Sequence, residues 1–351
     1  MVHLWVRAES RPNEDRVGIT PEGVAALIAG GMQVTVEDSP NRIIPTGHYS
    51  KTGAEITPFG AWVDAPDDAI IFGLKELPED GTPLRHRHIM FGHAFKGQPA
   101  GQILLRRFKA GGGALYDLEY LLDENGRRLA AFGYWAGYAG AAVSLRAWAA
   151  QRQGRICPPV HAWPDKAAMT NDLRAVLDGT GHPRPTAIVI GAGGRVGTGA
   201  SDLLTQMGCT VTRWDMAETA HGGPFPEILT HDLFINAILA SPGCPVFVPA
   251  EATRPGRALT VIGDVACDPT SEFSPIKVYD RTTSWDQPVL RVADQPVLDV
   301  MAIDNLPSML PRESSADYAG QLLPVLQQLD RIEAGPWGRA RALFNQHQSE
   351  V

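Results

Sequence analysis

The sequence lacks the cysteine patterns that mark metal-binding or disulfide-stabilised proteins. Only four cysteines occur in 351 residues: Cys157, Cys209, Cys244 and Cys267. They are far apart and form no CxxC pair, so neither a zinc site nor a disulfide framework is expected. Idle thiols of this kind are typical of a reducing cytosol. We therefore predict a cytoplasmic protein with no bound metal.

Long apolar runs and an excess of positive charge are also missing. Glycines, Ser144 and Arg146 interrupt the longest apolar region, residues 130–150, whereas a membrane span needs about 20 apolar residues. The N-terminus carries charges where a signal peptide needs an apolar run. The net charge is −8 and the pI about 5.7, which argues against a binder of phosphate backbones. These absences predict a protein that has neither a membrane nor a nucleic acid as its partner.

Short apolar runs alternate with helix signals over the first 130 residues, as in parallel α/β domains. The runs are residues 69–72, 88–91 and 113–116. Ionisable side chains follow each run: Lys75 and Glu76, then His93, then Asp117 and Glu119. Because the carboxyl ends of parallel strands share one edge, where ligands bind in open α/β folds, we expect these side chains at a ligand-binding edge. Taken alone, the pattern also fits strand ends that are polar because they reach water.

A glycine-rich segment, residues 191–199, follows a buried strand predicted at 186–190 and precedes a helix predicted at 200–207. The glycines let the backbone approach a pyrophosphate, whose charge a helix N-terminus favours. Asp215 lies 24 residues beyond Gly191, at the end of the next strand. An acid there binds ribose hydroxyls and repels a 2′-phosphate, so NAD is favoured over NADP.

The spacing of these glycines departs from a clean GxGxxG. Counted from Gly191 and Gly193, the third glycine, Gly197, comes one residue late, while counting Gly194 in the middle gives GxxGxxG. Both variants occur among dinucleotide binders. A ligand-free glycine turn is the alternative interpretation.

The position of the glycine segment indicates the domain organisation, because about 185 residues come before it. Two further strands are predicted at 233–236 and 259–262, and a helix at 312–332. We predict the α/β class, with two Rossmann-like domains, parallel sheets and an interdomain cleft. Residues 1–132 plus 312–351 would form a substrate and catalytic domain, and residues 133–311 an NAD-binding Rossmann domain.

Several stretches together resemble one family, and the resemblance runs in register along the chain. These stretches are residues 7–9 with 14–16, 73–78, 86–96 with Gln98, 115–119, 126–128 with 131–133, 191–199, 214–215 and 303–313. They resemble the NAD-dependent, L-lysine-forming saccharopine dehydrogenases, relatives of alanine dehydrogenase and the transhydrogenase domain. The resemblance implies an oxidoreductase of lysine metabolism. It would oxidise the secondary amine of saccharopine to an imine, which water splits into lysine and 2-oxoglutarate, and it would run in reverse as well.

The resemblance also implies roles for the ionisable side chains. Lys75 matches the lysine that takes the amine proton, which requires a pKa lowered by burial or by a nearby cation. His93 matches the histidine that handles the protons of water, a role suited to a group that titrates near neutrality. Glu76 and Glu119 match carboxylates that tune these two groups.

Substrate and cofactor positions follow from the same match. Arg16, Arg127 and Arg128 would bind substrate carboxylates, with Gln98 and Phe132 nearby. The implied cofactor-binding residues are Gly191, Gly193, Gly194, Arg195, Val196, Gly197, Asp215, Thr219, Leu239, Val265, Ile303, Asp304, Asn305 and Leu306.

Some positions depart from the family pattern. Val196 and Ala237 stand where fungal relatives carry cysteines, so no disulfide is available there. Asn305 stands where relatives often carry histidine, and Leu239 where the family has a different side chain. Fungal relatives favour a monomer, whereas alanine dehydrogenases are oligomers.

Two other functions remain open at this level. An opine or alanine-type dehydrogenase that uses another amine or keto acid would need the same Lys75 and His93. The adjacent Arg127 and Arg128, with residues 306–313, favour the saccharopine reaction, because a dicarboxylate partner needs extra cations. A non-catalytic NAD-sensing module would bind the cofactor without turnover.

Overall fold

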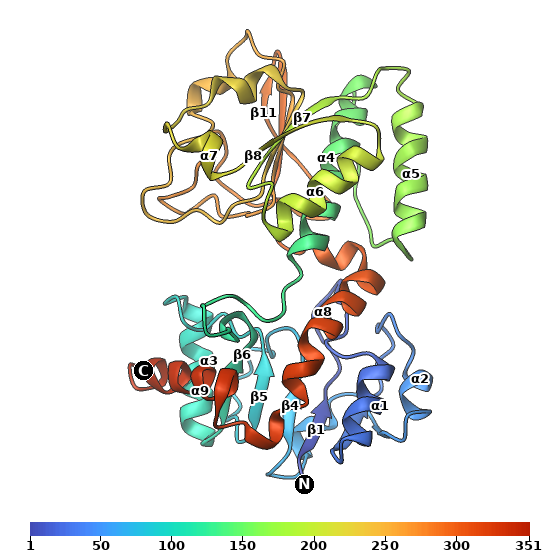
Figure 1. The fold of residues 1–351 in the computed structure, drawn as a ribbon, viewed down its shortest axis with the longest axis vertical. Coiled ribbons are helices and arrows are strands. Elements are labelled where there is room, and N and C mark those ends of the chain that lie inside the picture. The colour runs from blue at the N-terminus through green and yellow to red at the C-terminus, as the bar shows by residue number, and fades with distance from the viewer. The chain divides into compact units, whose positions relative to one another are not determined.

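Two six-stranded sheets dominate the computed structural model, which describes residues 1–351. Each sheet belongs to its own unit (Figure 1). The first unit combines Met1–Ala131 with Pro311–Val351, and the second unit is Phe132–Leu310. The second unit is therefore inserted into the chain of the first. The predicted fold class, α/β with two Rossmann-like domains and parallel sheets, is confirmed, except that one strand of the second sheet is antiparallel.

All strands of the first unit are parallel, in the order β3-β2-β1-β4-β5-β6. They are β1 (His3–Val6), β2 (Gln33–Glu37), β3 (Glu55–Thr57), β4 (Ile70–Phe72), β5 (Arg87–Met90) and β6 (Ala114–Asp117). The strand order reverses between β1 and β4. In open α/β sheets, ligands bind outside the carboxyl ends of the strands at such a switch point.

Helices from both ends of the chain complete the core of the first unit. They are α1 (Pro21–Ala29), α2 (Thr46–Ser50), α3 (Pro99–Gly111), α8 (Pro311–Leu326) and α9 (Gly335–Gln348), with 3₁₀ turns at Ala61–Asp64, Leu118–Tyr120 and Leu329–Arg331. The Thr20 hydroxyl caps α1 by accepting from the Gly23 N–H at 3.3 Å. On α9, the Trp337 ring packs edge-on against Tyr116 of β6 and donates to the Val325 carbonyl at 3.0 Å. The C-terminal helices thus cover a face of the sheet formed by the N-terminal segment.

The sheet of the second unit has the order β11-β12-β10-β9-β7-β8, with only β11 antiparallel to its neighbour. Its strands are β7 (Thr186–Ile190), β8 (Thr210–Trp214), β9 (Leu233–Asn236), β10 (Val261–Asp264), β11 (Leu290–Asp294) and β12 (Val297–Met301). The first strand, β7, lies between β8 and β9. The strand order therefore reverses at β7, directly before the glycine segment.

Two helices of the second unit, α4 and α6, pack unusually closely. They are α4 (Gly133–Arg152), α5 (Lys166–Asp178), α6 (Arg195–Gln206) and α7 (Met216–Thr219), with 3₁₀ turns at Pro226–Thr230, Ala250–Thr253 and Leu306–Met309. A Cβ at Gly137 would lie 1.8 Å from the Val196 carbonyl oxygen, and one at Gly199 would lie 1.9 Å from that of Tyr134. Only glycine permits this contact between α4 and α6. No helix in the chain has both the length and the apolar character that crossing a bilayer requires.

Candidate active site

His93 lies between two carboxylates at the carboxyl edge of the first unit's sheet. Its Nε2 is 3.2 Å from Glu76 Oε1, and its Nδ1 is 3.6 Å from Glu119 Oε2. Glu76 follows β4, His93 follows β5 and Glu119 follows β6, so three neighbouring parallel strands bring the groups together. Glu119 also pairs with Lys96 at 3.0 Å and Arg128 at 2.8 Å. The edge therefore carries a connected network of charges.

The network shifts the pKa of its members in opposite directions. The Glu119 carboxylate raises the pKa of His93 above its usual value, against the effect of burial. In turn, His93 and Lys96 lower the pKa of Glu119 to about 2. Burial raises the pKa of Asp117 to about 6; its carboxylate accepts from the Gly92 and Glu119 N–H groups. Glu119 is thus ionised at neutral pH, and its carboxylate favours the protonated form of His93.

The backbone of His93 adopts an uncommon left-handed conformation, with φ of +48°. Residues other than glycine rarely adopt this backbone conformation, and those that do cluster at functional sites. The turn at His93 leaves 45% of its side chain exposed, although Gly92 and Ala94 on either side are buried. The backbone conformation presents the imidazole at the edge of the sheet instead of in the core.

Lys75 follows β4 at the switch point and is half-buried. Burial lowers the pKa of its amine, and the Arg16 guanidinium lowers it further, while Glu14 opposes both effects. No hydrogen bond or salt bridge holds this amine. The direction of the shift is the one that a base working near neutral pH requires.

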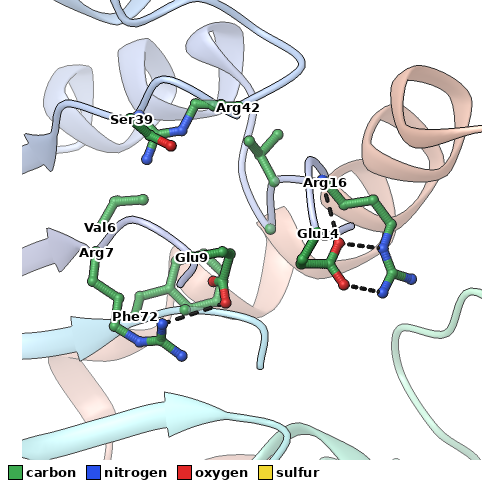
Figure 2. Close-up of a pocket in the computed structure, with 11 residues that line it drawn as sticks. Val6, Arg7, Glu9, Glu14, Arg16, Ser39, Arg42 and Phe72 are labelled. Atoms are coloured by element: carbon green, nitrogen blue, oxygen red, sulfur yellow. Dashed lines mark hydrogen bonds and ion pairs between the residues drawn. The ribbon is translucent and has the colours of Figure 1, made fainter. Parts of the chain in front are cut away.

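Arg16 forms a buried, two-point ion pair with Glu14, at 2.7 Å and 2.5 Å (Figure 2). Both side chains are almost fully buried, and they line a cavity of about 20 Å³ together with Arg7, Glu9 and Arg42. A space of this size holds about one water molecule. The Nε and Nη2 groups of Arg16 are therefore bound to Glu14, while the charge of its guanidinium still lowers the pKa of Lys75.

A larger cavity of about 370 Å³ opens next to His93 and Glu76 and is also lined by Arg11 and Gln98. Gln98 is exposed and lies directly before α3. Arg128 joins the edge through Glu119, whereas Arg127 is exposed and forms no ion pair with the network. The structure brings Gln98 and Arg128 to the cluster but does not bring Arg127 there. Phe132 is the first residue of the second unit and precedes α4.

In the second unit, the glycine segment forms a tight turn between β7 and α6. Gly191 has φ of +88°, and a Cβ at Gly197 would lie 2.1 Å from the Gly191 carbonyl oxygen. Gly194 is the N-cap residue of α6, so Arg195, Val196 and Gly197 occupy the first helical turn. The predicted helix start at residue 200 was wrong, because α6 begins at Arg195. The turn leaves the N-terminus of a 12-residue helix facing the edge of the sheet, where it favours an anion.

Asp215 follows β8 and lies against the glycine segment. Its Oδ2 accepts from the Gly193 N–H at 2.7 Å, and its Oδ1 accepts from the Met216 N–H at 2.9 Å. Each carboxylate oxygen keeps a second acceptor site, which ribose hydroxyls can use. Thr219 donates to the Asp215 carbonyl at 2.9 Å and so fixes the short helix α7. The residues present fit a dinucleotide with free ribose hydroxyls.

The other predicted cofactor residues fall into three groups by exposure. Leu239, with 72% of its surface exposed, and Asp304 are open to solvent, and Val265 and Asn305 are half-buried. Ile303 and Leu306 are almost completely buried, so only their backbone can face a ligand. No group of three or more His, Cys, Asp or Glu side chains is arranged to hold a metal ion, and all four cysteines are free.

Sequence reasoning assigned no site role to several charged residues at this edge, although residues 7–9 and 14–16 were among the family stretches. Glu14 pairs with Arg16, Arg11 lies 3.4 Å from Glu76, and Arg7 and Glu9 follow β1 directly. The signal that could have found Arg7 and Glu9 was the one applied to the other strands, namely ionisable residues immediately after a buried run.

The chain is similar to known proteins over nearly its whole length. Residues 5–139 match the family profile "Alanine dehydrogenase/PNT, N-terminal domain". Saccharopine dehydrogenase (NAD(+), L-lysine-forming) of Candida glabrata is 43% identical, covering 100% of this chain and 98% of the relative. The enzymes of the same name from Yarrowia lipolytica and Neurospora crassa are each 44% identical, covering 99% and 98% of this chain and 97% and 95% of theirs.

Solved structures agree on the fold. An L-alanine dehydrogenase superposes with a TM-score of 0.69 at 19% identity, covering 99% of this chain and 94% of its own. A transhydrogenase from Sinorhizobium meliloti gives 0.63 at 20% identity, with 94% and 95% covered. These structures share the two-unit α/β fold of this chain, and the profile match places its N-terminal unit with alanine dehydrogenase and transhydrogenase domains. Within this group, the chain belongs to the saccharopine dehydrogenase (NAD(+), L-lysine-forming) family.

Proposed function

We propose that this chain oxidises L-saccharopine with NAD to give L-lysine and 2-oxoglutarate, and that it also catalyses the reverse reaction in lysine metabolism. The observation that carries the proposal is identity of 43–44% to enzymes of that name along essentially the whole chain. The network around Lys75 and His93 supports it, because the reaction needs two separate proton acceptors.

NAD is the proposed cofactor. When bound, it accepts the hydride from the carbon next to the substrate nitrogen. Gly191, Gly194 and Gly197 would let the backbone approach the pyrophosphate, and the first turn of α6, including Arg195 and Val196, would stabilise its charge. Asp215 would bind the ribose hydroxyls and disfavour a 2′-phosphate.

The remaining cofactor contacts are proposed on the resemblance and on their exposure. Thr219 would support the ribose end through Asp215. Leu239, Val265, Ile303, Asp304, Asn305 and Leu306 would line the cofactor, with Ile303 and Leu306 contributing backbone.

Lys75 is the proposed base for the substrate nitrogen. Its lowered pKa favours the neutral amine, the form that takes the proton from the secondary ammonium of saccharopine. His93 would then accept a proton from the water that attacks the imine carbon. Glu76 and Glu119 would orient His93 and stabilise its charged form, which is consistent with the raised pKa of its imidazole.

Substrate carboxylates are proposed to bind at the cationic positions of this edge. Arg16 and Arg128 would offer guanidinium donors, with Gln98 at the mouth of the larger cavity. Arg127 and Phe132 are proposed on the family resemblance alone. Lysine, 2-oxoglutarate and saccharopine are the small-molecule partners.

We also propose that the chain works in the cytosol as a monomer. Four free cysteines fit a reducing compartment. Light scattering coupled to size exclusion would test the monomer, because a dimer would elute with twice the chain mass.

The experiment that tests the proposed function follows NADH oxidation at 340 nm with 2-oxoglutarate and a panel of lysine, ornithine, alanine and ammonia. Turnover that is strongest with lysine, and lost in Lys75→Met and His93→Gln, is the expected result. Stronger turnover with another amine would replace saccharopine by a related opine, and no turnover despite NADH binding would favour a sensing module.

A further inference from the structure

The segments that follow β1 and β4 lie side by side at the switch point of the first unit. The two strands are parallel neighbours, with Val6 opposite Phe72. The Arg7 N–H continues the pairing by donating to the Phe72 carbonyl at 2.9 Å. Beyond that point, residues 7–9 run beside residues 73–75, and the proposed base Lys75 is the last of these.

Glu9 holds the backbone of this second segment from one side. Its Oε1 accepts from the Leu74 N–H at 2.6 Å, and its Oε2 accepts from the Lys75 N–H at 3.0 Å. A carboxylate that accepts two backbone N–H groups is a strong, directional contact. The position of the Lys75 backbone nitrogen is therefore set by a side chain from another strand.

Arg7 holds the same residue from the other side. Its guanidinium donates to the Lys75 carbonyl oxygen. It also lies 3.3 Å from Glu9 Oε2 (Figure 2). Both polar groups of the Lys75 backbone are thus bound by one ion pair. The Arg7 side chain is 2% exposed and the Glu9 side chain 9% exposed, so water competes little with these bonds.

The ion pair is itself fixed by its surroundings. A Cβ at Gly73 would lie 2.4 Å from the Arg7 guanidinium, so only glycine leaves room for that group. Between the two charged residues, the Ala8 N–H donates at 2.9 Å to the buried carboxylate of Glu37. Glu37 also accepts from the Trp5 indole at 3.0 Å and the Trp62 N–H at 2.6 Å, which anchors the turn to the body of the unit.

The amine end of Lys75 has no comparable support. No hydrogen bond or salt bridge holds its Nζ, so the position of the amine depends on where the backbone starts the side chain. We propose that the Arg7–Glu9 ion pair is a positioning device for Lys75, holding its backbone so that the amine stays buried beside Arg16. The inference rests on the proposed function, because Lys75 needs positioning only if it transfers a proton.

Neither Arg7 nor Glu9 acts on Lys75 mainly through charge in this arrangement. The charged neighbours that influence the Lys75 pKa are Arg16, Glu14, Arg11 and Glu76, after burial itself. Loosening the backbone would change the pKa of Lys75 by admitting water to the amine, which reverses the largest cause of its shift. A purely structural ion pair would lower stability without changing that pKa.

The test compares Glu9→Gln with the wild type. The amide keeps the size of the side chain but replaces one acceptor oxygen with a donor that faces a backbone N–H. We expect kcat for saccharopine oxidation to fall roughly 10- to 100-fold, as for a small displacement of a reacting group. The ascending limb of the pH profile should move to higher pH, and the Kd for NADH should stay unchanged, because the glycine turn belongs to the second unit.

Two further variants separate positioning from folding. Glu9→Asp keeps the charge and should restore part of the lost kcat and return the pH limb toward that of the wild type. Asp172→Asn removes a more exposed ion pair, with Arg146 at 2.5 Å in the second unit, and should lower the Tm while leaving kcat unchanged. A Glu9→Gln variant that loses Tm like Asp172→Asn, with wild-type kcat and pH profile, would overturn the inference.

A second measurement needs no turnover. NMR of protein labelled at lysine Cε, with the Lys75 signal assigned from Lys75→Met, gives the amine pKa directly. Glu9→Gln should raise that pKa toward the ordinary lysine value, and an unchanged value would overturn the inference. A wild type that binds NADH but does not oxidise saccharopine would instead contradict the proposed function, whatever this titration shows.

Discussion

The carboxyl edges of the two sheets use different parts of the polypeptide. In the first unit the edge is made of side chains: His93 sits between Glu76 and Glu119, and Lys75 lies beside Arg16. In the second unit the edge is mainly backbone, with a glycine turn and the N-terminus of α6. Both edges lie where the strand order reverses, so the same topology supports two kinds of site.

The difference follows from what each edge has to do. Proton transfer needs groups whose pKa lies near the working pH, which a histidine has and which a lysine approaches only when burial and nearby charges lower its pKa. Binding a phosphate needs donors that do not titrate, which backbone N–H groups supply. Substitutions in the first unit should therefore change pH dependence, and those in the second unit should change cofactor affinity.

The largest effect is expected from Lys75→Met. Loss of the proposed base should lower kcat about 10²- to 10⁴-fold, the usual contribution of general base catalysis. The Kd for NADH, measured by fluorescence titration, should not change. Lys51→Met, at an exposed position of the same unit, is the matched control and should behave like the wild type. A Lys75→Met enzyme with normal turnover would remove the amine from the mechanism.

Gly197→Ala should have the complementary effect in the second unit. Its new Cβ would lie 2.1 Å from the Gly191 carbonyl oxygen, and overpacking of this kind costs about 1–3 kcal/mol. If the turn opens to relieve the clash, the Kd for NADH rises roughly 10- to 100-fold. Gly47→Ala, where a Cβ meets nothing within 4 Å, is the control. Unchanged NADH binding in Gly197→Ala would contradict the role of the glycine turn.

The free energy of unfolding of the first unit should decrease at acid pH because of His88. This side chain is completely buried among Trp62, Phe108 and His86, neither ring nitrogen has a hydrogen-bond partner, and burial holds its pKa well below the usual value. Below pH 6.5 the unfolded chain binds a proton that the folded protein does not, so stability falls as the pH falls.

His88→Leu should remove this part of the acid sensitivity. The wild type should lose stability relative to the variant by about 1.4 kcal/mol for each pH unit below 6.5. Denaturant unfolding at pH 7 and pH 5 measures the difference. His182→Leu, at an exposed position, is the control, and parallel pH dependence in all three proteins would contradict a neutral buried His88.

Glu119→Gln tests the smallest effect, a change in the pKa of one imidazole. The Glu119 carboxylate raises the pKa of His93, so removing its charge should lower that pKa toward or below 6.5. The titration of the His93 ring protons in NMR, assigned from His93→Gln, gives the value. Glu124→Gln, an exposed carboxylate of the same unit, should leave it unchanged. A higher His93 pKa in Glu119→Gln would contradict the conclusion that the Glu119 carboxylate raises it.

Parts of the fold were predictable because their local signal is strong. The strand at residues 233–236 was predicted with the bounds that β9 has, since all four residues are buried. Other elements had a weaker signal. β10 begins two residues later than predicted and includes Gly263 and Asp264, which interrupt an apolar run. β3 and β11 are largely exposed or half-buried edge strands without an apolar run.

The site followed the same rule. Lys75, His93 and Glu119 could be placed on one edge because parallel strands end together, whereas the 3.2 Å contact of His93 with Glu76 depends on the left-handed turn at His93, which no pattern predicts. The first turn of α6 was missed because glycine is a poor helix former in sequence scales. Gly197 is instead required by its close contact with the Gly191 carbonyl oxygen, and Gly199 by its close contact with α4.

The insertion of the second unit into the first also sets the order in which the two units can be completed during synthesis. On the ribosome, residues 132–310 are synthesised before α8 and α9, which complete the first unit. The face of β6 that carries Tyr116 stays exposed to solvent or to chaperones until Trp337 packs against it. The unit whose translation starts first is therefore completed last, and a chain that ends before residue 311 would combine a complete second unit with a first unit that lacks α8 and α9.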